Sequence, residues 1–189
     1  KGESNPALRL VYIGAMGRSY DLETMLEAVR ALHARGVNIE LHIAGEGEKL
    51  QLLQALASGW GDSVVTFHGY LDREGLIELL KRSDVGLIPM YPASGVSIPY
   101  KAGDYLAAGL PIINSLGGEL DELLEANACG SSYEAGNCES LMAVLTTFAD
   151  QSSENQIVAK ANARQLFESH FNRERTYPKF SRWLGTLSS

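Results

Sequence analysis

Short apolar segments alternate with longer amphipathic segments along most of the chain. The segment Leu8–Gly14 (LRLVYIG) is mostly apolar and has the length of a buried strand. From Asp21 to Gly36, apolar residues recur every three or four positions, which is typical of a helix with one buried face. Gly36 predicts the end of this helix, because glycine readily adopts the left-handed conformation that follows many helices. The alternation recurs about five or six times before the C-terminus.

Four more predicted strands are short and mostly apolar: Ile39–Gly45, Val64–Gly69, Val85–Met90 and Pro111–Asn114. The more polar segment Ser131–Glu134 is a possible last strand. The other predicted helices lie between and after them: Glu48–Ser58, Arg73–Arg82, Lys101–Ala108, Glu119–Asn127 and two or three more from Cys138 to Leu187. Apolar strands separated by helices predict a parallel sheet that is covered on both sides. The predicted fold class is therefore α/β, a doubly wound, mostly parallel Rossmann-like sheet with helices on both faces. No linker divides the chain, so we expect residues 1–189 to form one domain.

Composition restricts the partners of this domain. Of the 189 residues, 45% are hydrophobic and 21% are charged, as in an ordinary globular protein. The formal net charge of −7 argues against sequence-independent binding of nucleic acid, which needs a basic face. Cys129 and Cys138 lie nine positions apart without a neighbouring His or Cys cluster, so we expect neither a zinc site nor a disulfide. This cysteine usage is typical of a reduced, cytoplasmic protein.

No segment approaches the roughly 18 to 20 uninterrupted apolar residues of a membrane-spanning helix. The polar start of the chain is unlike a signal peptide. The chain does not begin with Met, and we expect it to be one part of a longer protein.

Ligands of open parallel sheets bind beyond the carboxyl ends of the strands, so the residues there are the candidate site. Gly14 and Gly17 form a turn after the first strand, and with the Arg18 guanidinium they could present N–H groups to a phosphate. A solvated surface arginine is an equally good interpretation of Arg18. The turn has neither the G-x-G-x-x-G spacing of dinucleotide-binding proteins nor the P-loop motif.

The next two strand ends add weaker candidates. Glu46 and Gly47 follow the second strand, where simple turn chemistry is the alternative interpretation. After the third strand, Gly69 could let the backbone approach a planar ligand, and Tyr70 could offer its ring. His68 is more typical of a satisfied core histidine than of a catalytic one.

The loop and helix after the fourth strand carry the most specific pattern. Ser97, Ile98 and Pro99 lead into a helix whose first turn offers free N–H groups and the Lys101 cation, a combination that suits a phosphate. Asp104 lies one turn further on and could accept hydrogen bonds from a ribose. An ordinary Lys–Asp surface pair is the alternative interpretation.

From about Leu8 to Trp183, the chain resembles the C-terminal, donor-nucleotide-binding half of the retaining glycosyltransferases of family 4, which have two Rossmann-like domains (the GT-B fold). The blocks that carry the resemblance occur in order: YIGAMGR, IAGEG, VTFHGYLDREGLIELLKRSDVGLIPM, SGVSIPYKAGDYLAAGLPII and the turn Gly117-Gly118-Glu119. The resemblance implies that Ser97, Ile98, Pro99 and Lys101 bind the diphosphate and the sugar, and that Asp104 contacts the ribose.

The chain departs from the typical family pattern in two places. Many members have two glutamates eight positions apart, and the matching residues here are Val96 and Asp104. Ala15 and Tyr20 stand where an Arg and a Lys are often found, which leaves Arg18 as the cation of that turn. The motif Pro99-Tyr100-Lys101 looks like that of a subgroup in which this helix start supplies part of the positive charge.

The resemblance implies retaining transfer of a hexosyl group from a UDP-sugar or GDP-sugar to a glycan or lipid-linked acceptor. Arg18 and Lys101 would be the catalytic cations, and no metal or other cofactor would be required. The acceptor pocket and general base would come from an N-terminal domain outside this chain, so we expect the isolated domain to be inactive. The implied setting is polysaccharide biosynthesis in the cytoplasm, at the inner face of the membrane, with no nucleic-acid partner.

Two other functions remain open at this stage. A sugar-nucleotide epimerase of similar build would need paired acid and base carboxylates and a histidine across the cleft. A non-catalytic binding module of receiver or flavodoxin type would share the fold, although a receiver needs acidic residues where this chain has Ile13-Gly14-Ala15. For the C-terminal aromatic residues we expect either an exposed apolar patch or a contact that supports a crystal dimer; they are Phe167, Phe171, Tyr177, Phe180 and Trp183.

Overall fold

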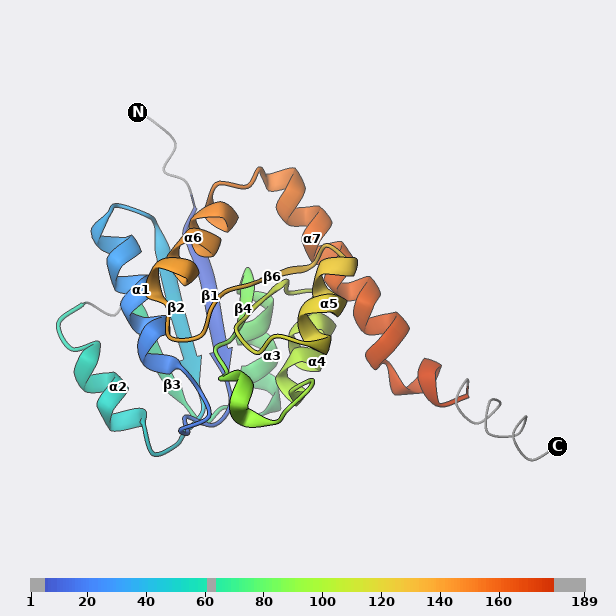
Figure 1. Cartoon of the computed structure of the whole chain (residues 1–189), viewed down its shortest axis with the longest axis horizontal. Coiled ribbons are helices and arrows are strands. Elements are labelled where there is room, and N and C mark those ends of the chain that lie inside the picture. Colours follow the sequence, from blue (N-terminus) through green and yellow to red (C-terminus); the bar gives the residue numbers. More distant parts are fainter. Residues whose placement is uncertain (1–5, 61–63, 179–189) are drawn as a thin grey trace.

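The computed structural model describes residues 6–60 and 64–178, which form one six-stranded sheet with helices packed around it (Figure 1). The strands are β1 Leu8–Ile13, β2 Ile39–Ala44, β3 Val65–Gly69, β4 Val85–Ile88, β5 Ile112–Asn114 and β6 Gly130–Ser132. The order across the sheet is β3-β2-β1-β4-β5-β6, and every neighbouring pair is parallel. This is the doubly wound order with its switch point between β1 and β4, so the predicted fold class is confirmed.

The helices lie close to their predicted positions. They are α1 Leu22–Ala34, α2 Leu50–Leu56, α3 Arg73–Lys81, α4 Tyr100–Ala107, α5 Glu119–Ala126, α6 Cys138–Ala149 and α7 Ser153–Leu166, with a 3-10 turn Pro92–Ser94 and a π-helical turn Phe167–Phe171. Side chains cap several of these helices: the Asp72 carboxylate accepts a hydrogen bond from the Gly75 N–H at 2.8 Å, and Asn137 does the same for Ser140 at 3.0 Å. The last predicted helix continues to Leu187, beyond the described residues.

The pleat of β1 divides the core into two layers. Leu10 and Tyr12 face one cluster, whereas Val11 and Ile13 face the other, because successive strand residues point to opposite faces. Figure 1 shows α1 and α6 in front of the sheet and α3 behind it. Both faces of β1 are therefore buried, as its continuous apolar sequence predicts.

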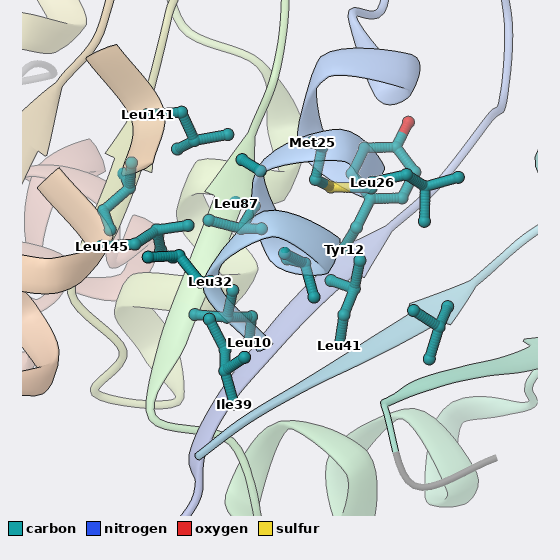
Figure 2. Packing of buried hydrophobic residues seen from close by; sticks show 14 of the residues in the cluster. Leu10, Tyr12, Met25, Leu26, Leu32, Ile39, Leu41, Leu87, Leu141 and Leu145 are labelled. Atoms are coloured by element: carbon teal, nitrogen blue, oxygen red, sulfur yellow. The ribbon is translucent and has the colours of Figure 1, made fainter. Parts of the chain in front are cut away.

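The front layer is built from α1, α6 and the front faces of β1 and β2. Figure 2 shows Met25, Leu26 and Leu32 of α1 packed over Leu10 and Leu41 of the sheet. Each of these five side chains is at most 2% exposed. Burying such side chains contributes about 1.5–3 kcal/mol apiece before the entropy of ordering is subtracted.

The C-terminal aromatic residues do not all form the patch that we expect from sequence. Phe167 and Phe171 are half-buried and pack against the core cluster that contains Val11 and Ile13, so the prediction of exposure is wrong for them. Tyr177 is exposed, whereas Phe180 and Trp183 lie outside the described residues. The sequence pattern does not reveal that the π-helical turn folds back against α4.

Candidate functional site

A cavity of about 480 Å³ opens beyond the carboxyl ends of the strands, near the switch point. Its floor is the end of β1 and the turn that follows, and its walls come from the end of β3, from α3 and from the segment that leads into α4. The lining includes one glycine and five polar or charged residues: Gly14, Tyr20, Tyr70, Tyr100, Lys101 and Asp104. The remaining wall is mostly apolar, including Leu71, Leu76, Met90, Val96, Ile98 and Pro99.

Lys101 is the most unusual side chain of this cavity. It lies in the first turn of α4 and is only 8% exposed. Its Nζ atom is buried without a hydrogen-bond partner among the described residues. Burial without a compensating partner lowers the pKa of Lys101 from the usual 10.5 to about 7. The alternative of an ordinary Lys–Asp surface pair is therefore wrong.

Two tyrosine rings take the place of a counter-ion. The Nζ atom lies 4.1 Å from the ring centroid of Tyr12 and 4.1 Å from that of Tyr20. The two rings meet edge to face, with 5.9 Å between their centroids. Rings at these distances attract an ammonium group through their π faces, but they accept no strong hydrogen bond from it. We call Tyr12 and Tyr20 the tyrosine cage.

The start of α4 suits an anion for a second reason. The helix begins after Pro99, and within the described part of the chain no side chain caps this terminus. The first N–H groups of a helix have no partner inside the helix and lie at the positive end of its dipole. Lys101 and the uncapped end of α4 thus combine next to the same cavity.

Asp104 lies one turn after Lys101 and lines the same cavity. Its side chain remains exposed, and partial burial raises the pKa of its carboxyl. Tyr70 and Tyr100 frame the opening, and they are 78% and 91% exposed. Both rings are therefore open to a planar ligand.

The turns after β1 and β2 interlock. A methyl group at Gly45 would lie 2.0 Å from the Gly14 carbonyl oxygen, and one at Gly47 would lie 2.6 Å from the Met16 backbone. The Met16 N–H also donates to the Glu46 carbonyl at 2.9 Å. Glu46 and Gly47 thus hold the first turn in shape, and neither lines the cavity.

Arg18 and Gly17 also lie outside the cavity lining. The Arg18 side chain is 89% exposed and pairs with Glu48 at 3.3 Å. Such an exposed pair is weak, so it holds the guanidinium in place only loosely. The role of Arg18 at a phosphate stays a prediction.

Ser97 and Gly69 make structural contacts near the cavity without lining it. The Ser97 hydroxyl donates to the Glu119 carboxylate, which ties the loop before α4 to the start of α5. The Gly69 carbonyl accepts from the Gly45 N–H at 2.7 Å, at the end of the β2–β3 ladder. Of the sequence candidates, the structure brings together Gly14, Tyr70, Ile98, Pro99, Lys101 and Asp104.

Sequence reasoning missed three tyrosines. Tyr12 and Tyr20 form the cage, and Tyr100 stands at the opening. Tyr12 has the position of a core strand residue, and nothing in its spacing points to Lys101. Tyr100 could have been found, because it stands inside the motif Pro99-Tyr100-Lys101.

The described residues contain no group of three His, Cys, Asp or Glu side chains placed to hold a metal ion. None of the helices within 6–60 and 64–178 is long and apolar enough to cross a bilayer.

Comparison with known proteins identifies the family. Over 185 residues the chain is 28% identical to the amylovoran biosynthesis glycosyltransferase AmsK of Erwinia amylovora. The matched region covers 96% of this chain and 45% of that protein. The chain spans less than half the length of the curated relatives that it matches.

Solved structures share the fold. WaaG, a glycosyltransferase involved in lipopolysaccharide biosynthesis, superposes with a TM-score of 0.68 at 22% identity, over 89% of this chain and 44% of that one. HepE from Anabaena, solved in complex with UDP, gives a TM-score of 0.79 at 13% identity, over 95% and 49% of the two chains. A family model described as "Glycosyl transferases group 1" matches residues 7–151, more than half of the sequence, and the chain therefore belongs to the group 1 glycosyl transferases.

Proposed function

We propose that this chain is the donor-binding domain of a retaining hexosyltransferase, and that its cavity binds a nucleoside diphosphate sugar. The observation that carries the proposal is Lys101, a buried amine without a hydrogen-bond partner among the described residues, next to the uncapped N-terminus of α4. A buried lysine without a partner is costly for stability, so a role in binding an anion is a good reason for its presence. Membership of the group 1 family supports the same proposal.

The lining of the cavity suggests how the donor lies. The diphosphate would lie between the Gly14 turn and the first turn of α4, where Lys101 supplies positive charge. Asp104, one turn further along, would accept hydrogen bonds from the ribose. The base would lie at the opening, against Tyr70. UDP or GDP fits this arrangement, and the UDP complex of the similar HepE structure favours UDP.

The reaction would depend on stabilising the leaving group. As the bond between the sugar and the diphosphate breaks, negative charge grows on the diphosphate oxygens. The N–H groups of α4 and the Lys101 ammonium would stabilise this charge more in the transition state than in the ground state. Arg18 would add a second cation once its weak pair with Glu48 opens. In this proposal no metal ion is needed for the charge that develops.

The complete enzyme would need a second domain. The general base and the acceptor pocket would lie on an N-terminal domain, so this chain alone would bind the donor and catalyse little. The similarity to a glycosyltransferase of amylovoran biosynthesis and to one involved in lipopolysaccharide biosynthesis favours a glycan or lipid-linked acceptor. We propose a cytoplasmic protein that acts at the inner face of the membrane.

Isothermal titration calorimetry of the 189-residue chain tests the donor site. UDP, GDP, ADP and their sugar conjugates are titrated in EDTA, and saturable binding of one base is expected. Lys101→Ala should weaken binding by at least about 1.5 kcal/mol, the lower end for a hydrogen bond to a charged group. Lys81→Ala is the matched control, because Lys81 is exposed and paired with Glu78. Equal affinities of the two variants would contradict the assignment of Lys101.

A further inference from the structure

In the unliganded structure the Lys101 amine cannot contact a ligand in the cavity. Its Nζ atom is buried, although Lys101 is one of the residues that line the cavity. A phosphate oxygen is about as large as a water molecule. An atom that water cannot reach therefore cannot contact a phosphate either. Either Lys101 or a residue of the tyrosine cage must move before the amine meets an anion.

The two rings of the cage are held to different degrees. Tyr12 is completely buried, and its hydroxyl donates to the Ala15 carbonyl. Tyr20 is half-buried and borders the cavity, although its backbone is fixed: its N–H donates to Gly17 at 3.1 Å and its carbonyl accepts from Lys49 at 2.9 Å. Tyr20 and Gly14 both line the cavity next to the amine: the Tyr20 ring centroid lies 4.1 Å from Nζ, and a methyl group at Gly14 would lie 3.3 Å from it. The Lys101 stem is a chain of four carbons with rotatable bonds, so the amine can be repositioned while the Tyr20 backbone stays in place.

We propose that Tyr20 is a positioning residue that holds Lys101 in a closed position against Tyr12, and that a nucleoside diphosphate draws the Lys101 amine out of this cage into the cavity. The proposal rests on the proposed function, since it assumes that a diphosphate binds there. It goes further by assigning a role to Tyr20, where the resemblance expects a lysine.

Release from the cage has a consequence for protons. The titratable groups next to the amine are Tyr12 and Tyr20 in the cage. Asp104 and Tyr105 lie on its own helix, and Tyr105 interacts electrostatically with both cage residues. Among the described residues no carboxylate lies within ion-pair distance of Nζ, so burial dominates and the pKa of Lys101 falls to about 7. Beside a diphosphate the ammonium form is favoured again. Above neutral pH, binding would therefore take one proton from solvent and convert the Lys101 amine to an ammonium.

This linkage makes affinity depend on pH in a defined way. Above about pH 7.5 the dissociation constant of UDP should rise about tenfold per pH unit, because each unit removes nine-tenths of the remaining protonated amine. Calorimetry in buffers of different ionisation enthalpy at about pH 8.5 should show uptake of about one proton per UDP bound. The nitrogen chemical shift of Lys101 Nζ, assigned with Lys101→Arg, should report an amine without UDP and an ammonium with it.

Two substitutions of Tyr20 distinguish a specific role in holding the Lys101 amine from a general role in packing. Tyr20→Ala opens the cage, so the free amine should titrate near the usual lysine range and the proton uptake should fall by at least half. Tyr20→Phe keeps the ring and should leave both readouts as in the unmodified chain. Folding of both variants is checked from their amide spectra, and Tyr20→Leu replaces Tyr20→Ala if the latter does not fold.

The outcomes distinguish this inference from the donor-site proposal. The role of the tyrosine cage is contradicted if UDP binds without proton uptake. It is also contradicted if the Lys101 nitrogen is an ammonium at about pH 9 without UDP. Either result leaves the proposal of donor binding intact. If UDP, GDP and inorganic pyrophosphate all fail to bind, both proposals are wrong. Equal proton uptake by Tyr20→Ala and Tyr20→Phe contradicts the role of Tyr20.

Discussion

The ring of Tyr105 packs directly onto the backbone of Gly86: a methyl group added at Gly86 would lie 2.4 Å from the Cγ atom of that ring. The Tyr105 side chain is fully buried, and its hydroxyl accepts from the Ile13 N–H at 2.9 Å. The same hydroxyl lies 3.2 Å from the carbonyl oxygens of Val11 and Leu87, to either of which it can donate. One side chain of α4 thus joins the helix to both β1 and β4.

This contact fixes the helix that carries Lys101 and Asp104. Tyr105→Phe should lower the free energy of unfolding by about 1–3 kcal/mol, because the buried Ile13 N–H loses its acceptor. Urea denaturation measures the loss. Tyr177→Phe is the control, since Tyr177 is 60% exposed and its substitution should change stability by less than about 0.5 kcal/mol. Equal effects of the two substitutions would show that the Tyr105 hydroxyl does not carry this contact.

The alternation of segments was enough to predict the fold, because buried parallel strands must be apolar on both faces. Val85–Ile88 is buried at every position, as its apolar sequence VGLI predicts. Element ends were less predictable: α2 begins at Leu50 because Gly47 and Lys49 still belong to the interlocked turns. The strand Gly130–Ser132 has mostly exposed side chains. It is recognised as a strand by its pairing with β5, which an apolar pattern in the sequence does not reveal.

The site was predictable where its residues come from one segment. Ile98, Pro99, Lys101 and Asp104 follow one another in sequence, and all four line the cavity. The tyrosine cage was not predictable, because Tyr12 and Tyr20 lie more than 80 positions before Lys101 and meet it through the β1–β4 crossover. Sequence spacing carries no signal for a contact of this kind.

Asp21 joins the loop before α4 to the turn before α6. Its carboxylate is 1% exposed and accepts hydrogen bonds from the Tyr91 hydroxyl at 3.2 Å and the Gly136 N–H at 2.6 Å. Asp21→Ala should lower the free energy of unfolding by about 2–4 kcal/mol, since hydrogen bonds to a buried charge are lost. Tyr91→Phe removes one bond at a partly exposed ring and should cost about 1 kcal/mol or less.

A double-mutant cycle measures the contact between these two residues. The cost of Asp21→Ala with Tyr91→Phe should be smaller than the sum of the single costs, by about 0.5–1 kcal/mol. Additive costs would mean that Asp21 acts through Gly136 alone.

His42 and His68 form a pair between β2 and β3, with 3.1 Å from Nδ1 of His42 to Nε2 of His68. Burial lowers the pKa of His42 despite the nearby Glu40 carboxylate. Burial and the His42 charge lower the pKa of His68. The neutral forms are thus favoured in the folded chain, where one ring donates to the other.

The sign of the resulting pH dependence follows from proton counts. Below the usual pKa of 6.5, the unfolded histidines bind protons that the folded pair still excludes. Stability therefore falls as pH drops below about 6.5 towards the lowered pKa values. The variant with His42→Gln and His68→Gln should lose less stability than the unmodified chain between about pH 7.5 and 5. Parallel melting curves would contradict the role of the pair.

Lys101 should reduce the stability of the unliganded chain, as expected for a residue retained for binding. Its buried ammonium has no hydrogen-bond acceptor among the described residues, so Lys101→Met should raise the free energy of unfolding by about 1–3 kcal/mol near pH 6. Methionine has a similar length and brings no charge. Lys81→Met, at an exposed position, is the control and should change stability little.

The gain from Lys101→Met should depend on pH. Between about 7, the pKa of Lys101 in the fold, and the usual 10.5, the unfolded chain holds a proton that the folded chain has released. Stability of the unmodified chain therefore rises with pH across this interval, and the advantage of Lys101→Met shrinks between about pH 6 and 9.5. Urea denaturation at these two pH values measures the change. A variant that is less stable than the unmodified chain at both would show that the tyrosine cage stabilises the ammonium by more than its burial costs.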